Sequence, residues 1–313
     1  MAITLMLPRV DAAPPEFHQA VADSGAALHY RFDESAGPAI NYGTLGSAYN
    51  ANYLGSIQRL VPTCIGDFCV AFNGSDDYLE SQAAASAAFL GNPTFTAETV
   101  VFIPTNGFAT LWPPFLHWGQ GATGREVYFS LQHNRPDVAY SGFYNAGLRA
   151  TLPFPLGRWH HIVWVRQGGG NAITGTTLYI DGQSVALEVD TDLCCNATVP
   201  DVVSTAFRVN RARDFTRYFT GSMDELALYP RALAESEVIA HYSATRIGQL
   251  PGDLNCDGIV NNFDIDPFVL ALVAPDQYEA AFPNCDRTAA DANGDGSVDN
   301  FDIDPFVQLL TCG

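Results

Sequence analysis

The clearest chemical signal in the sequence is a pair of twelve-residue segments, at 253–264 and 291–302, that are rich in oxygen-bearing side chains. Each has Asp or Asn at positions 1, 3, 5, 9 and 12, and glycine at position 6, where a calcium loop turns sharply. Calcium prefers oxygen ligands, and position 7 adds its backbone carbonyl. We therefore expect two calcium ions, one held by Asp253, Asn255, Asp257, Ile259, Asn261 and Asp264, the other by Asp291, Asn293, Asp295, Ser297, Asp299 and Asp302.

The two segments belong to an internal repeat, since residues 253–272 match residues 291–310 at 14 of 20 positions with an offset of 38. A pair of acidic loops without ions is the alternative, but their crowded carboxylates would repel one another. A helical pattern follows each loop, at 263–273 and 301–310. The repeat therefore predicts a small α module built from two calcium-binding loop-helix units.

This duplicated pattern, with Asp at position 12 of each loop, resembles the type I dockerin, a calcium-dependent module that docks onto cohesins. The match covers residues 252–311 and implies a cohesin-like receptor as a possible partner. Dockerins commonly carry small hydroxyl residues at loop positions 10 and 11, whereas both loops here have Asn-Phe. Calcium binding therefore carries over better than cohesin binding. We expect the repeated phenylalanines to belong to the module's own core: Phe263, Phe268, Phe301 and Phe306.

Charge divides the chain of 313 residues into two parts. Residues 250–313 hold 12 acidic residues and one arginine, whereas residues 1–249 hold 22 acidic residues and 14 arginines. The formal net charge of −19 argues against nucleic acid as a partner, and no apolar run is long enough to insert into a membrane. We expect a disordered or processed segment at 1–22, a β-sandwich at 23–247, a linker at 248–251 and the calcium module at 252–313.

Between residues 26 and 228, short alternating apolar runs are separated by Gly, Pro, Asn and Asp, a pattern typical of an all-β sandwich. Five motifs in this region together resemble the laminin-G-like, concanavalin A-like jelly-roll domains of secreted and surface proteins. The resemblance covers about residues 20–247 and implies a two-sheet sandwich that often binds carbohydrate or protein and is only sometimes an enzyme. The motifs are YRFDE at 30–34, VAFNGSDDYL at 70–79, GRWHHI at 157–162, LYIDG at 178–182 and FTGSMDEL at 219–226.

Several side chains of the sandwich are candidates for binding a ligand. Exposed aromatic rings stack on sugar faces, and the candidates in the middle loops are Trp112, Trp118, Tyr140, Phe143 and Tyr144. Some domains of the resembled family hold calcium at the sandwich edge. Asp33 and Asp224 occupy matching places here, whereas Asn41 stands where the family often has Asp. The alternative for the aromatic residues is that most of them belong to the core.

A catalytic site is not expected. A glycosidase needs two carboxylates across the sugar, and the related β-glucanases carry Glu-x-Asp-x-x-Glu on one strand face, a string that this chain lacks. The isolated Glu98 and Glu126 are expected to lie on solvated strand faces.

Seven cysteines in a Gly- and Pro-rich chain favour an oxidising compartment. Cys64 can pair with Cys69, and Cys256 with Cys285, whereas the adjacent Cys194 and Cys195 are expected to pair elsewhere because their Cα atoms lie close together. We expect a secreted or cell-surface, non-catalytic protein that recognises a glycan or an extracellular protein. The alternatives are a structural component that docks to a cohesin-like receptor and a glycoside hydrolase of the concanavalin A-like fold.

Overall fold

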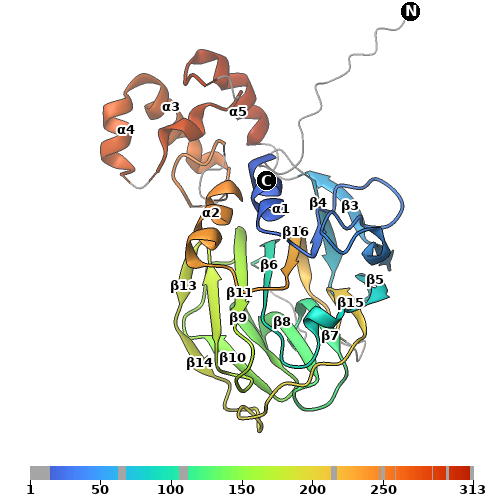
Figure 1. Ribbon diagram of the computed structural model, residues 1–313. Coiled ribbons are helices and arrows are strands. Elements are labelled where there is room, and N and C mark those ends of the chain that lie inside the picture. The colour runs from blue at the N-terminus through green and yellow to red at the C-terminus, as the bar shows by residue number, and fades with distance from the viewer. Residues whose placement is uncertain are drawn as a thin grey trace, which may run out of the picture.

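The computed structural model describes residues 15–62, 68–105, 112–212, 217–245, 247, 251–257, 259–283, 285–293 and 296–310. Two eight-stranded sheets pack face to face, and every strand pair in them is antiparallel. A separate lobe of short helices follows the sandwich (Figure 1). Within the described residues no helix is both long and apolar enough to span a membrane.

The first sheet carries the helices that follow and precede the sandwich. Its strands run in the order β13-β12-β11-β6-β16-β4-β3, with β1 also paired to β16. The Asp181-Gly182 turn joins β12 to β13, as the sequence predicts. The bounds are β1 (Leu28–Tyr30), β3 (Gln58–Pro62), β4 (Phe68–Asn73), β6 (Phe95–Phe102), β11 (Trp159–Arg166), β12 (Thr176–Ile180), β13 (Gln183–Val185) and β16 (Thr220–Tyr229).

The second sheet forms the other layer of the sandwich. Its strands run in the order β14-β10-β9-β8-β7-β15-β5-β2. The bounds are β2 (Ala51–Leu54), β5 (Tyr78–Ala84), β7 (Pro114–Gly119), β8 (Glu126–Gln132), β9 (Arg135–Phe143), β10 (Ala146–Ala150), β14 (Leu187–Val189) and β15 (Ala206–Val209).

An aromatic core fills the space between the sheets. The Phe95 ring centroid lies 4.8 Å from that of Trp164 and 5.4 Å from that of Trp118, and both pairs meet edge to face. Phe129 and Phe207 extend the contacts across the second sheet, and all five side chains are almost fully buried. Edge-to-face packing adds about 1 kcal/mol per pair to the burial of apolar area. Trp118, expected as a sugar contact, is therefore a core residue.

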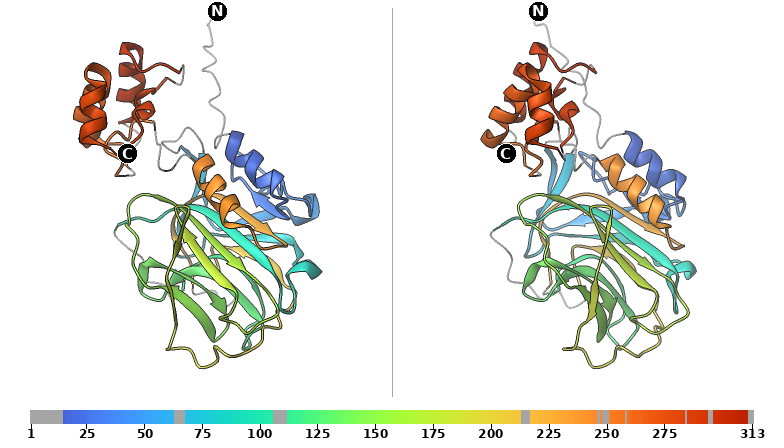
Figure 2. Two further views of the ribbon diagram at one scale, coloured as in Figure 1. Left: turned by 60° about the vertical axis from the view of Figure 1, so that its left-hand side comes forward. Right: turned by 90° about the vertical axis from the view of Figure 1, so that its left-hand side faces the viewer.

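Two helices cover the outer face of the first sheet, α1 (Pro15–Asp23) and α2 (Glu235–Thr245), and they lie side by side (Figures 1 and 2). Phe17 and Val21 of α1 and Val238 of α2 are buried against sheet residues such as Val163. The helix at the end of the sandwich matches the sequence prediction. The expectation of disorder up to residue 22 is wrong for residues 15–22, because the apolar face of α1 has a sheet to pack on, and residues 1–14 lie outside the described part.

Beneath α2, the carboxylate of Glu98 is buried in the first sheet. It accepts hydrogen bonds from His161 of β11 at 3.1 Å, from His241 of α2 at 2.9 Å and from the Tyr229 hydroxyl at 2.9 Å. Burial raises the pKa of Glu98, but the two histidines lower it by more, so the net effect is a lowered pKa. The Glu98 carboxylate in turn raises the pKa of His241. The expectation of a solvated Glu98 is therefore wrong, since α2 covers this strand face and supplies a cation.

A second buried carboxylate lies beneath α1. Glu225 of β16 bonds through one oxygen to His18 of α1 at 2.5 Å and through the other to His29 of β1 at 2.6 Å. The histidines lower the pKa of this carboxyl against the effect of burial. Each helix therefore docks on the sheet through apolar residues and through one histidine that reaches a buried glutamate.

The C-terminal lobe is built from α3 (Ile265–Val273), α4 (Pro275–Ala281) and α5 (Ile303–Leu309). α3 and α5 follow the two acidic loops, as predicted, while α4, which lies between the two repeats, was not predicted. Phe268 and Phe306, which are equivalent in the repeat, stack with 3.9 Å between ring centroids and nearly parallel planes. The two loop-helix units therefore share one core, completed by Leu254, Ala271 and Tyr278.

Replacing Glu98 by Gln is expected to lower the free energy of unfolding by about 3 kcal/mol, because the substitution leaves His241 buried beside a neutral group. The measurement is denaturant unfolding of the full chain followed by far-UV circular dichroism. Glu188→Gln is the control, since Glu188 forms an exposed pair with Arg149 whose loss costs less than about 1 kcal/mol. Equal effects of the two substitutions would contradict this role for Glu98.

Candidate functional site

A pocket of about 110 Å³ lies on the outer face of the second sheet, on the side away from α1 and α2. Its lining brings together four of the five aromatic residues that the sequence nominated. Trp112 and Tyr144 are half-buried, so part of each ring remains accessible. The lining residues are Trp112, Tyr128, Tyr140, Phe143, Tyr144, Asn145, Leu193 and Arg217. We call this the aromatic pocket.

The floor of the aromatic pocket depends on glycines in the β9–β10 hairpin. Tyr140 lies across this hairpin, and a Cβ atom at Gly147 would stand 2.0 Å from the Tyr140 hydroxyl oxygen. A residue with a side chain at position 147 would therefore displace the ring. Burial and the nearby charge of Asp190 raise the pKa of Tyr140, so its hydroxyl stays protonated. Phe143 is 1 % exposed and separates the pocket from the aromatic core.

A buried polar network lies next to the pocket. Glu126 of β8 is bonded to His117 of β7 and accepts a hydrogen bond of 3.2 Å from the hydroxyl of Tyr128, a lining residue. Glu126 and His117 are fully buried. The expectation of a solvated Glu126 is wrong, because loops cover this strand face and the neighbouring strand supplies a histidine. A carboxylate thus lies one hydrogen bond away from the aromatic pocket.

One wall of the pocket comes from the segment that follows β14. Asp190 is buried and accepts a hydrogen bond of 3.1 Å from Gln132 of β8. Leu193 of this segment lines the pocket, and the Cys195 N–H donates to the carbonyl of Asn145, another lining residue, at 3.0 Å. Cys194 and Cys195 form a disulfide with each other, contrary to the expectation that each pairs elsewhere. The adjacent cysteines close a small ring despite a Cα–Cα distance of 3.8 Å.

The residues proposed for an edge calcium site have other roles in the sandwich. The side-chain oxygen of Asn41 accepts hydrogen bonds from the backbone N–H groups of His29 at 2.8 Å and Gly43 at 2.9 Å. Two donors occupy both lone pairs of an amide oxygen, so Asn41 holds the backbone together here. Asp33 pairs with Arg31 at 3.3 Å, and Asp224 is a buried residue of β16.

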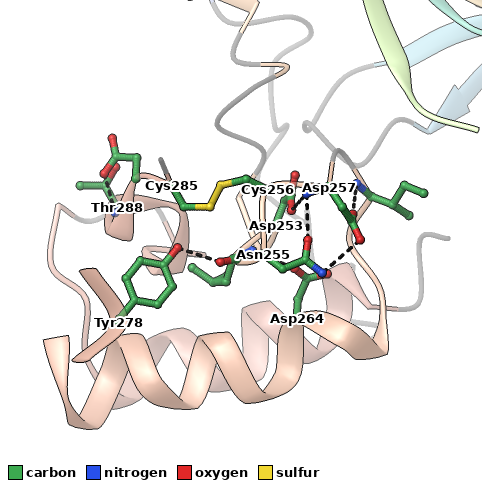
Figure 3. Close-up of a disulfide and its surroundings, with 11 residues drawn as sticks. Asp253, Asn255, Cys256, Asp257, Asp264, Tyr278, Cys285 and Thr288 are labelled. Atoms are coloured by element: carbon green, nitrogen blue, oxygen red, sulfur yellow. Dashed lines mark hydrogen bonds between the residues drawn. A yellow bond between two sulfur atoms is a disulfide. The ribbon is translucent and has the colours of Figure 1, made fainter. Parts of the chain in front are cut away.

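In the first acidic loop, the oxygens expected to hold calcium converge at the start of the loop. The N–H of Asp257 lies 3.2 Å from Oδ1 of Asp253 and 2.8 Å from Oδ1 of Asn255. Asp264 closes the loop, since its two oxygens accept from the N–H groups of Leu254 and Asn261, both at 2.8 Å. Figure 3 shows these residues beside the Cys256–Cys285 disulfide, the pairing expected from the sequence.

The second loop repeats this arrangement. Asp302 is fully buried and accepts from the N–H groups of Asn293 at 3.1 Å and Asp299 at 2.8 Å. In both loops the residues at positions 9 and 12 form a reciprocal capping box, in Asn261–Asp264 and in Asp299–Asp302. Asp295, and Gly258 of the first loop, lie outside the described residues. Among the described groups no cluster of three or more His, Cys, Asp or Glu meets the geometry of a formed metal site.

The donor set nevertheless fits a hard cation. Asp264 and Asp302 are fully buried carboxylates, and Asp253 is 3 % exposed. The lobe's only arginine, Arg287, donates its Nε–H to the Ala271 carbonyl instead. Buried carboxylates require a cation or several hydrogen-bond donors, and the oxygen ligands that converge here are those that calcium prefers.

Two pairs of repeated phenylalanines have opposite environments. Phe268 and Phe306 form the core of the lobe, as expected, but Phe263 and Phe301 are 72 % and 70 % exposed. The prediction of a core role for the exposed pair is wrong, because the capping boxes direct the chain so that only the later phenylalanine of each repeat faces the other unit. Apolar residues at equivalent helix positions are also exposed, namely Ile265, Val269, Ile303 and Val307.

No sequence pattern marks His117, Asp190, Asn145, Leu193 or Arg217 as parts of a site. Their partners come from strands and loops far away in the chain, so no local spacing joins them. Cys64, expected to pair with Cys69, lies outside the described residues. The two disulfides within the described residues fit an oxidising environment.

The family comparison concerns the sandwich. The family model for the concanavalin A-like lectin/glucanases superfamily matches residues 73–239, slightly more than half of the chain. No curated protein sequence matches the chain. The family match therefore covers the aromatic pocket and leaves out the C-terminal lobe.

Solved structures share the fold at low sequence identity. The binding domain of botulinum neurotoxin DC, in complex with rat synaptotagmin II, has a TM-score of 0.50 and 10 % identity over 73 % of this chain and 53 % of that one. Domain 4 of an extracellular arabinanase from Geobacillus stearothermophilus, in complex with arabinotriose, has a TM-score of 0.48 and 14 % identity over 69 % of this chain and 98 % of that one. Trypanosoma rangeli sialidase has a TM-score of 0.48 and 21 % identity over 71 % of this chain and 33 % of that one.

This chain therefore spans a third of the sialidase and about half of the toxin domain. The expectation that the protein is not an enzyme does not stand, because the matching family model describes lectins and glucanases together. The lack of a Glu-x-Asp-x-x-Glu string therefore does not exclude a catalytic role.

The two environments of phenylalanine in the lobe lead to a direct test. Phe268→Ala is expected to destabilise the lobe by about 3 to 5 kcal/mol, because it removes a buried ring from the stacked pair. Phe263→Ala makes the same chemical change at an exposed position and is expected to cost less than about 0.5 kcal/mol. Denaturant unfolding of the full chain, followed by hydrogen exchange within the lobe, measures both. Comparable losses would contradict the exposure of Phe263.

Proposed function

The chain belongs to the concanavalin A-like lectin/glucanases superfamily, and from this we propose that its sandwich recognises carbohydrate in the aromatic pocket. The observation that carries the proposal is the gathering of Trp112, Tyr140 and Tyr144 around one pocket on the outer face of the second sheet. Aromatic rings bind the apolar faces of sugars, and hydroxyl and amide groups orient them. The disulfides and the family both fit a secreted or cell-surface protein.

The half-buried members of the pocket contribute most to ligand contact in this proposal. Trp112 and Tyr144 present accessible ring surface, whereas Tyr140 and Phe143 support the floor from below. Asn145 and Arg217 add polar groups at the same pocket. Arg217 lies 5.3 Å from the centroid of the Trp112 ring, which restricts the motion of both side chains.

Hydrolysis of a glycoside at the same pocket is the second candidate function. The observation that favours it is Glu126, a buried carboxylate bonded to His117 and to the hydroxyl of the pocket residue Tyr128. In such a reaction Glu126 would hold or release a proton through Tyr128. Glycosidases use two carboxylates, and Asp190, buried in the pocket wall segment, is a second acidic group close to the pocket residues.

Binding to a glycan and polysaccharide array, with the full chain in millimolar calcium and again in excess chelator, tests the main proposal. Trp112→Ala and Tyr144→Ala are each expected to weaken binding roughly tenfold, which corresponds to about 1.4 kcal/mol. Tyr42→Ala is the matched control, since Tyr42 is 48 % exposed and lies outside the pocket. If the chain releases reducing sugar from a bound glycan and the Glu126→Gln variant does not, the result would favour hydrolysis, the second candidate. Silence of the array in both conditions would contradict carbohydrate recognition.

For the C-terminal lobe we propose two bound calcium ions that stabilise the loops and allow the lobe to mediate assembly. Asp253, Asn255 and Asp257 supply converging oxygens in the first loop, and Asp264 closes it. Bound calcium would supply positive charge next to the lobe's buried carboxylates. The exposed Phe263 and Phe301 favour a protein partner, such as a cohesin-like receptor, in a structural role for the lobe.

Isothermal titration calorimetry of the full chain, stripped with chelator, is expected to show two calcium ions per chain. Asp264→Ala should leave one site, because it removes the residue that closes the first loop. Asp266→Ala is the control, since it removes the same charge from an exposed position two residues later. An unchanged stoichiometry in Asp264→Ala, or no calcium binding at all, would contradict the proposal.

A further inference from the structure

The wall of the aromatic pocket contains a disulfide between adjacent residues, Cys194 and Cys195. Cys194 is exposed and Cys195 is half-buried. Linking neighbouring residues closes a small ring that includes their peptide bond, so the ring restricts the backbone of both residues. Residue 193, next to this ring, lines the pocket.

Hydrogen bonds connect the ring to the opposite side of the pocket. The N–H of Cys195 donates to the carbonyl of Asn145 at 3.0 Å, and Asn145 lines the pocket in the turn between β9 and β10. The next residue, Asn196, accepts from the N–H of Gly147 at 2.9 Å and donates to the carbonyls of Asp190 and Leu193. Gly147 is the glycine that makes room for the Tyr140 ring. The conformation of residues 194–196 therefore determines where two walls of the pocket meet.

We propose that the Cys194–Cys195 disulfide is a redox-sensitive clasp that keeps the aromatic pocket in its binding-competent shape. Reduction frees the backbone of both residues, and ordering a freed residue again costs conformational entropy. The wall segment, residues 190–198, then exchanges among several conformations, and the contacts to the β9–β10 turn weaken. The regulation of ligand affinity rests on the proposed function of the pocket, whereas the loosening of the wall does not.

The chemical step is a thiol–disulfide exchange with a dithiol reductant. A thiolate of the dithiol attacks one sulfur of the pair, breaks the Cys194–Cys195 bond and forms a mixed disulfide. The second thiol of the reductant resolves the mixed disulfide, so the reductant leaves as a cyclic disulfide. Two electrons and two protons pass to the protein, which then holds two thiols. The exposure of Cys194 gives the reductant access.

Amide hydrogen exchange of the full chain, with and without dithiothreitol, tests the clasp without any sugar. Reduction should speed exchange at least about fivefold in residues 145–147 and 190–198, since the exchange rate of a protected amide rises in proportion to the fraction of time that the wall is open. Cys194→Ser/Cys195→Ser should show the fast exchange under both conditions. Cys256→Ser/Cys285→Ser, which removes the other disulfide, should respond to the reductant as the unmodified chain does.

Three results would overturn the clasp. They are unchanged exchange in both segments after reduction, a dithiothreitol response that persists in Cys194→Ser/Cys195→Ser, and a pair that alkylation and mass spectrometry show to resist reduction. For a glycan found on the array, the dissociation constant should rise about fivefold on reduction, in proportion to the loss of the competent state. A loosened wall with no glycan bound would contradict the proposed function alone, and a bound glycan with an unchanged wall would contradict the clasp alone.

Discussion

The packing of the two sheets around Phe95, Trp118 and Trp164 is the constraint on which the other features depend. Because side chains alternate across a strand, the inward direction of these rings determines which residues face outward. Glu98 and Glu225 consequently lie on the outer face of the first sheet, and Tyr128 and Tyr140 on the outer face of the second. A shift of one residue in the register of either sheet would bring these polar groups into the core. The buried carboxylates and the aromatic pocket are therefore consequences of the same packing.

Two solutions to the burial of a carboxylate occur in this chain. In the sandwich, Glu98, Glu225 and Glu126 are each bonded to histidine, and for Glu98 and Glu225 the histidines lower the pKa of the carboxyl against the effect of burial. In the C-terminal lobe, Asp264 and Asp302 accept backbone N–H groups at a helix start, where the partial positive charge of the helix favours an anion. Backbone donors alone compensate a buried anion less fully than a cation does, and the lobe's arginine is engaged elsewhere. This difference is the physical basis of the calcium proposal for the lobe.

The sequence predicts features that depend on residues close together in the chain, and it misses those that depend on contacts between distant segments. Strand alternation, the Asp181-Gly182 turn and the repeat of the acidic loops are local patterns, and they predicted the sandwich and the helices α3 and α5. The roles of Glu98 and Glu126 depend on histidines of other strands or of α2, so a reading of each strand by itself placed them in solvent. Trp118 of β7 and Tyr140 of β9 lie on the two strands that flank β8, and the direction of each ring places Trp118 in the core and Tyr140 in the lining of the aromatic pocket. The family was inferred from five ordered motifs, and the family model matches residues 73–239, which hold the last three of these motifs and most of the second.

The aromatic pocket combines a rigid floor with walls that are made by loops. Tyr140 and Phe143 rest on the packed sheet, so their positions follow from the core. Leu193 and Asn145 belong to segments whose relative position is set by a few hydrogen bonds and by the Cys194–Cys195 ring. Connecting segments tolerate change that a packed sheet does not, and binding residues are often placed on them for this reason. Ligand affinity in such a pocket depends on the fraction of time that the walls are closed, while the floor contributes shape. A covalent ring in the wall therefore has a larger influence on binding than its small area of contact suggests.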